Sequence, residues 1–228
     1  MAIQTLIYAL LGGLLPAIIW LVFWLKEDSA HPEPRGLILK TFIFGMIAVL
    51  LVLPFQKLVE SWIPGELALS TLFLWVVFEE LFKLVAAYFG GLHSREDNEP
   101  IDPMIYMITA ALGFVALENT LFILGPLIND ELVKGVITGN LRFIGASLLH
   151  IIASGIIGAA MALTFYKSRS ARTSLLLLAL IGATIIHTVF NFFILKWDVL
   201  GTVSVFALVW AGAISLLLLF EKIKLIAR

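Results

Sequence analysis

The chain has 228 residues, of which 61% are hydrophobic and only 14% are charged. Roughly a quarter of the residues of a soluble domain are charged, so this composition excludes an ordinary soluble protein and indicates a polytopic membrane protein. The formal net charge of -1 gives no reason to expect nucleic-acid binding, and the absence of cysteine excludes disulfides, thiolate metal ligands and a cysteine nucleophile.

Seven apolar runs are long enough to cross a bilayer as helices. The first run is too long for the apolar part of a signal peptide and lacks a basic segment before it, so we expect it to be retained. No soluble domain separates the runs, and residues 1–228 are expected to form a single integral-membrane domain. The expected spans are 3–25, 37–55, 67–91, 103–124, 143–166, 174–195 and 199–220.

Basic residues are distributed unevenly between the two sides of these spans. One side carries ten of them: Lys26, Arg35, Lys40, Arg95, Lys167, Arg169, Arg172, Lys222, Lys224 and Arg228. The other side carries four: Lys57, Lys134, Arg142 and Lys196. Cytoplasmic loops are enriched in lysine and arginine, so the count predicts a plasma-membrane protein with its N-terminus outside and its C-terminus in the cytoplasm.

The third span contains Glu79, Glu80 and Lys83 in the middle of an apolar run. A charge at bilayer depth costs several kcal/mol, so such groups usually face a protein interior or a water-filled cavity. Glu79 precedes Lys83 by four residues, the favourable order for an ion pair on a helix, and we expect these two to pair. Glu80 lies about a quarter-turn away from Glu79, so we expect one glutamate to handle water and the other to orient or pair.

Other spans contain further polar residues: Glu118 and Asn119 in the fourth, His150 in the fifth, His187 and Asn191 in the sixth. Counted at about 1.5 Å per residue from the outer ends of the spans, Glu118 and His150 lie roughly 10 Å deep, His187 roughly 12 Å and Glu79 roughly 18 Å. This agreement predicts an all-α, polytopic transmembrane helix bundle of about seven spans with a polar catalytic cavity near mid-membrane.

Each residue also has a plainer interpretation. A lone Glu–Lys pair can be structural, and a membrane histidine is often only an interhelical hydrogen-bond donor. The amides Asn119 and Asn191 suit an orienting role better than a reactive one. Arg142 is either an interface anchor or a residue that orients a carboxylate. Such structural roles explain the separate residues more easily than the whole group, which consists of Glu79, Glu80, Glu118, His150 and His187.

The cluster permits two kinds of hydrolysis. A buried carboxylate can act as a general base that activates water, with imidazoles and an asparagine amide stabilising the oxyanion. Alternatively, two histidines and a glutamate form a three-ligand set that leaves a position open for water on zinc. The chain lacks the His-Glu-x-x-His helix of ordinary zinc proteases. Water-mediated hydrolysis inside the membrane is the sharpest enzymatic hypothesis.

Four blocks between Trp75 and Asn191 resemble, in order, the motifs of the PrsW family of intramembrane proteases. They are Glu79-Glu80-Leu81-Phe82-Lys83, which resembles an EExxK motif; Asp102 through Tyr106 to Gly113–Asn119; His150 with Gly155 and Gly158; and His187-Thr188-Val189-Phe190-Asn191, which is similar to an HxxxN block. The resemblance implies a relation to a superfamily that includes bacterial CPBP proteins, CAAX prenyl proteases and the gamma-secretase scaffold subunit.

The resemblance also implies a function and a site. The expected reaction is site-1 cleavage of a membrane-anchored anti-sigma factor, which releases a stress response. The resemblance assigns catalysis to Glu79, Glu80, His150 and His187, with support from Lys83, Glu118, Asn119 and Asn191. It leaves open whether a metal takes part; a Zn2+ cofactor is expected to bind Glu118, His150 and His187.

The chain departs from the family pattern at one position, its first motif differs in spacing from that of a related family, and two alternative functions stay open. Pro103 stands where the family often has glycine, and the spacing of Lys83 differs from the EExxxR pattern of CAAX proteases, which argues against a prenyl-protein substrate. The alternatives are a non-catalytic membrane scaffold or chaperone-like subunit and, third, a proton-coupled transporter. The expected partners are a membrane-anchored protein substrate and the lipid bilayer, and the oligomeric state is left open.

Overall fold

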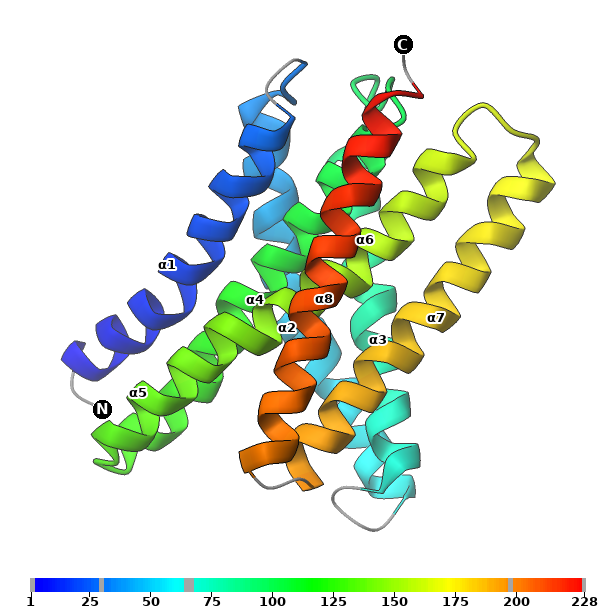
Figure 1. The fold of residues 1–228 in the computed structure, drawn as a ribbon. Coiled ribbons are helices and arrows are strands. Elements are labelled where there is room, and N and C mark those ends of the chain that lie inside the picture. The colour runs from blue at the N-terminus through cyan, green and yellow to red at the C-terminus, as the bar shows by residue number, and fades with distance from the viewer. Residues whose placement is uncertain (1–2, 29–30, 64–67, 197–198, 227–228) are drawn as a thin grey trace.

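The computed structural model describes residues 3–28, 31–63, 68–196 and 199–226, and within these ranges it contains helices and no strand (Figure 1). The expected all-α bundle is therefore confirmed. The helices are α1 (Ile3–Glu27), α2 (Arg35–Trp62), α3 (Leu69–Ala87), the π-helical η1 (Tyr88–Leu92), α4 (Asp102–Ile128), α5 (Leu132–Leu141), the π-helical η2 (Arg142–Ala146), α6 (Ser147–Leu163), α7 (Arg169–Lys196) and α8 (Val199–Lys224). Leu67, where the third span was expected to begin, lies outside the described residues.

Six helical segments of the described chain are long and apolar enough to cross a membrane. Five of them are α1, α2, α4, α7 and most of α8, and the sixth is the continuous stretch of α5, η2 and α6. The expected third span is present as α3, continued by η1, but Glu79, Glu80 and Lys83 make it too polar to join that group. All three side chains are buried, so α3 turns its charges toward the protein rather than toward lipid.

Two of the helix boundaries that differ from the sequence-based expectation bear on the polar residues of the third span. Helix α2 continues through Pro54 to Trp62 instead of ending at Phe55, since membrane helices tolerate an interior proline. The helix that contains the fifth span begins at Leu132 instead of at residue 143, because η2 joins α5 to α6 without a break. The two extensions add Gln56 and Arg142 to the helices that surround the third span.

Helix α4 is the centre of the bundle and packs against α1, α2, α3, α5 and α6. Its residues from Asp102 to Ala116 are all buried, as expected for a helix that is apolar on every side. Glycines bring α2 and α4 into backbone contact: a Cβ on Gly45 would lie 2.1 Å from the Ala110 carbonyl oxygen, and one on Gly113 would lie 1.9 Å from that of Phe42. Small residues permit this close approach of membrane helices.

At the end of the bundle that holds the C-terminal end of α8, two connections fold back against the start of α4 (Figure 1). They contribute Asp28, Glu33 and Asp97, and α4 itself begins with Asp102; we call these four residues the loop-end acidic cluster. Tyr106 donates a hydrogen bond to Glu33. Burial raises the pKa of Asp28 to about 7 and that of Glu33 to about 8. The acidic residues of these two connections are thus partly buried against α4.

Candidate active site

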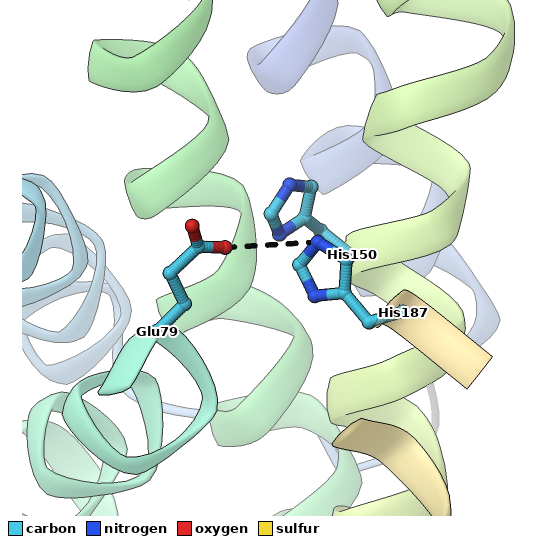
Figure 2. A group of neighbouring side chains, drawn as sticks. All are labelled: Glu79, His150 and His187. Atoms are coloured by element: carbon cyan, nitrogen blue, oxygen red, sulfur yellow. Dashed lines mark ion pairs between the residues drawn. The ribbon is translucent and has the colours of Figure 1, made fainter. Parts of the chain in front are cut away.

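Helices α3, α4, α6 and α7 bring six ionisable side chains together inside the bundle. We call these residues the intramembrane cluster: Glu79, Glu80, Lys83, Glu118, His150 and His187. Five of the six are buried, and the side chain of Glu118 is 15% exposed. Figure 2 shows three of them, with Glu79 of α3 pointing toward the imidazoles of α6 and α7. Residues more than a hundred positions apart in the sequence are thereby in contact.

Glu80 is the most heavily bonded carboxylate of the intramembrane cluster. Its Oε1 accepts a hydrogen bond from Lys83 Nζ at 2.5 Å and lies 2.7 Å from His187 Nδ1. The expected pairing of Lys83 with Glu79 is therefore wrong. Residues three and four apart share a helix face, so Lys83 can reach either glutamate. Glu79 is bonded instead from α2, where Gln56 Nε2 donates to Glu79 Oε1 at 3.0 Å.

His187 lies between the two adjacent glutamates. A carboxylate only accepts hydrogen bonds, so Nδ1 of a neutral His187 carries its proton toward Glu80 and Nε2 keeps a free lone pair. That Nε2 lies 3.6 Å from Glu79 Oε2 (Figure 2). Glu79 Oε2 is buried and has no hydrogen-bond partner among the described residues. Glu79 and Glu80 thus approach opposite nitrogens of one imidazole, and two lone pairs face each other across the gap to Glu79.

His150 is held from both sides. Lys83 only donates, so its contact of 3.0 Å with His150 Nδ1 makes that nitrogen an acceptor. The proton of a neutral His150 then lies on Nε2, which is 3.3 Å from Glu118 Oε2. The His150 and His187 rings meet edge to face with their centroids 4.6 Å apart. Lys83 therefore links Glu80 on its own helix to the imidazole on α6.

Arg142 orients Glu118, which is the second of the two interpretations of this arginine. Its Nη2 donates to Glu118, its Nε donates to Asn119 Oδ1 at 2.5 Å, and its guanidinium lies 3.9 Å from the centre of the Phe122 ring. Asn119 in turn donates to Ser147 Oγ at 3.2 Å. Arg142 begins the π-helical η2, and π-helical turns are frequent at functional sites. The planar guanidinium holds both acceptors in a fixed fork geometry, which the flexible ammonium of a lysine does not impose.

Sequence reasoning missed one contact and left one residue without a partner. Gln56 was missed because the second span was expected to end at Phe55, although a polar side chain directly beyond an apolar run was the available signal. Trp75, read as an interfacial residue, donates through Nε1 to the Gln56 carbonyl oxygen at 3.2 Å. Asn191 lies one turn beyond His187 on α7, half-buried, and its side chain makes no hydrogen bond to the residues that the structure describes.

Glu79, His150 and His187 each offer one potential metal-ligand atom, and the three atoms lie within 4.8 Å of one another. The set expected from the sequence differs in its carboxylate, since Glu118 already bonds to Arg142. Ligand atoms about 2.0–2.1 Å from a tetrahedral Zn2+ are roughly 3.3–3.4 Å apart. The free atoms of Glu79 and His187, 3.6 Å apart, fit such an ion, while His150 would exchange one of its present contacts for it.

Comparisons with known proteins identify relatives over most of the chain. The model of the PrsW family intramembrane metalloproteases matches residues 33–219. The protein named Protease PrsW from Halalkalibacterium halodurans is 26% identical over 196 residues, covering 83% of this chain and 84% of its own. That from Geobacillus kaustophilus is 26% identical and covers 88% and 87%, and that from Bacillus subtilis is 25% identical and covers 79% and 80%. No solved structure matches the chain.

Proposed function

The chain belongs to the PrsW family of intramembrane proteases, and from this membership we propose that the intramembrane cluster activates water to cut a peptide bond of a membrane-anchored protein. The observation that supports this most directly is the gap between Glu79 Oε2 and His187 Nε2. Two buried lone pairs at 3.6 Å repel each other unless a proton or a cation lies between them. A site built around such a gap can hold and move a proton.

In the proposed reaction Glu79 is the general base. It is chosen over Glu80 because its Oε2 faces His187 Nε2, while Oε1 of Glu80 is shared by Lys83 and His187. Glu79 takes a proton from water as the water oxygen attacks the carbonyl carbon, and it returns the proton to the leaving nitrogen as the C–N bond breaks. His187 orients the water, and the Nε2 proton of His150 is available to the developing oxyanion.

The remaining polar residues keep this arrangement in place. Glu80 fixes the tautomer of His187, and Lys83 neutralises Glu80 and orients His150. Glu118, with Arg142 and Asn119, holds the other side of the His150 ring. Asn191 is proposed to support the site only after substrate binds, since it has no bonded partner among the described residues. These proposed roles follow the assignment that the family motifs imply except at Glu80, which we propose positions His187 instead of reacting itself.

Zinc is the proposed cofactor. It would bind to Glu79, His150 and His187, and when bound it would supply Lewis-acid activation of the attacking water and of the substrate carbonyl. Glu80, bonded to the other nitrogen of His187, then holds that imidazole in position, as carboxylates behind metal-ligating histidines commonly do. The two uses of Glu79, base and ligand, are alternatives that elemental analysis of the purified protein separates: about one zinc per chain, lost in a His187→Asn variant, identifies the ligand role.

The proposed substrate is a membrane-anchored anti-sigma factor. The distribution of lysine and arginine supports a plasma-membrane orientation with the N-terminus outside and the C-terminus in the cytoplasm. The end of the bundle that contains the α2–α3 connection then faces outside, and the substrate would be cut from that side. Family membership favours this protease over the scaffold and the transporter.

Reconstitution in lipid vesicles with a single-span anti-sigma factor tests the proposal. We expect wild-type protein to release one defined fragment, and Glu79→Gln and His187→Asn to slow its release by about 100-fold or more. Glu33→Gln, a matched change in the loop-end acidic cluster, should keep the wild-type rate. Folded Glu79→Gln protein that cleaves at the wild-type rate would contradict the proposal.

A further inference from the structure

A cavity of about 300 Å³ lies between α2, α3 and α4, next to the intramembrane cluster. Most of its wall is apolar and includes Leu53, Trp75, Phe114 and Phe122. Pockets of a few hundred Å³ with mostly apolar walls and a few polar groups are typical of binding sites. This cavity is therefore a candidate site for a part of the substrate.

Two polar wall residues connect the cavity directly to the candidate active site. Gln56 lines it and donates its amide hydrogen bond to Glu79 at 3.0 Å. Glu118 lines it and lies 3.3 Å from His150 Nε2. A group in the cavity thus contacts Glu118 directly and is separated from Glu79 by the side chain of Gln56. None of the other large cavities in the described part of the chain is lined by a residue of that cluster.

The cavity is also open in the direction from which a membrane substrate would arrive. Leu53 is 39% exposed and Phe122 53% exposed on the outer surface of the bundle, where the surrounding medium is lipid. Leu53 and Phe122 line the cavity and face this medium. A chain that enters sideways between them reaches the cavity before it reaches the buried Glu79.

We propose that this cavity binds a large apolar side chain of the membrane-anchored substrate, within two residues of the bond that is cut. This inference rests on the proposed function. An extended chain advances about 3.3 Å per residue, so a side chain seated against Glu118 and Gln56 belongs to a position adjacent or nearly adjacent to the scissile bond. The aromatic and branched walls favour leucine or phenylalanine over alanine there, because burying each added methylene is favourable.

The test uses a single-span anti-sigma factor in vesicles, with alanine, leucine or phenylalanine at each of the positions flanking the mapped cleavage site. At one position wild-type enzyme should prefer leucine or phenylalanine over alanine by about tenfold or more. Leu53→Trp fills the cavity and should remove or reverse this preference. Leu51→Trp is the matched control on α2: Leu51 is 49% exposed and does not line the cavity, so the preference should remain.

Two further measurements test whether the substrate side chain lies in the cavity. If Leu53→Trp does not fold, Phe122→Ala enlarges the same cavity and should shift the preference further toward phenylalanine. In a Glu79→Gln background, a photoreactive phenylalanine at position 53 should cross-link the substrate and one at position 51 should not.

If wild type cleaves the substrate and both Leu53→Trp and Phe122→Ala keep its preference for leucine or phenylalanine, the cavity assignment is overturned. The proposed protease function is not affected by that result. If Leu53→Trp slowed cleavage of the alanine, leucine and phenylalanine substrates equally, the cavity would hold a lipid chain. That result would also overturn the cavity assignment. Absence of any fragment from wild type, with no cross-link from position 53, would overturn both proposals.

Discussion

The protein buries carboxylates in two places, and the two places differ in what surrounds them. In the intramembrane cluster every glutamate has a nitrogen partner: Gln56 and His187 for Glu79, Lys83 and His187 for Glu80, Arg142 and His150 for Glu118. In the loop-end acidic cluster Asp102 accepts two backbone N–H hydrogen bonds, but the carboxylates also lie close to one another, and burial raises the pKa of Asp28 and Asp97 to about 7. Burial alone therefore says little about a carboxylate; its partners decide what it does.

The difference also assigns different chemistry to the two clusters. A carboxylate with fixed N–H partners keeps a defined orientation, which catalysis requires. The carboxylates of the loop-end acidic cluster have raised pKa values, so they hold protons near neutral pH and respond to pH. Substitutions and conditions that act on one cluster should leave the other unchanged, and each of the following changes tests that separation.

The largest effect is expected from Lys83→Met. It leaves Glu80 buried without its cation, and removing one partner of a buried pair costs about 3–5 kcal/mol. Lys224→Met is the matched control, because Lys224 makes the same i,i+3 contact of 2.5 Å with Glu221, but at 25% and 58% side-chain exposure. That exposed pair should contribute less than about 1 kcal/mol.

Thermal or denaturant unfolding in detergent measures both Lys83→Met and Lys224→Met. Adding Glu80→Gln to Lys83→Met should recover part of the loss, because the unpaired charge is then gone. Equal destabilisation by the two lysine variants would show that burial of the pair at Glu80 has no special consequence.

The second effect concerns metal. Zinc at 100 times its dissociation constant should raise the free energy of unfolding by about 2.7 kcal/mol, because it binds only the folded site. His187→Asn should abolish this gain. The double variant Asp28→Asn, Glu33→Gln should keep it, since the loop-end acidic cluster contains no imidazole. A gain that persists without His187 would place the metal elsewhere.

The two clusters were not equally predictable from the sequence. Glu79, Glu80 and Lys83 stand in an apolar run, where a charge is costly enough to signal a site, and the helical bundle followed from the length of such runs. Asp28 and Asp97 stand in polar turns, where acidic residues are ordinarily solvated. Nothing in their spacing indicated that these turns fold back onto α4.

Partner choice inside the intramembrane cluster was the other unpredictable part. Helix geometry allowed Lys83 to pair three or four residues back, and the packing of α2, α6 and α7 around α3 decided between the two glutamates. The same holds for Arg142, whose two interpretations could be separated only once η2 placed it against α4. Residue types and depth are local properties of the chain, whereas hydrogen-bond partners depend on how the helices pack.

The third effect is a pH dependence that belongs to the loop-end acidic cluster. The pKa values of Asp28 and Glu33 are raised to about 7 and about 8 from ordinary values of 3.8 and 4.5, so the folded protein binds these protons more tightly than the unfolded chain. Their stabilisation is complete below about pH 4 and is lost as pH rises through about 7 to 8. The free energy of unfolding should therefore fall between pH 5 and pH 9.

Replacing both groups removes that dependence. Asp28→Asn with Glu33→Gln should reduce this fall in the free energy of unfolding by about 1–3 kcal/mol. The range is discounted for the partial exposure of Glu33. Unfolding at pH 5, 7 and 9 is the measurement, and Glu131→Gln, an exposed acid at another site, is the control. An unchanged slope in the double variant would assign the pH dependence to other groups.

The smallest effect is expected from Tyr106→Phe, and its pH dependence is more informative than its size. Tyr106 donates to Glu33, and this hydrogen bond lowers the pKa of Glu33 against the larger effect of burial, so it favours the ionised carboxylate. Its loss should cost about 1–2 kcal/mol at pH 9, where Glu33 is charged, and less at pH 6, where Glu33 is protonated. A cost independent of pH would mean that Tyr106 acts through packing alone. If Tyr106→Phe also slowed substrate cleavage, the two clusters would be coupled through α4, which contributes residues to both.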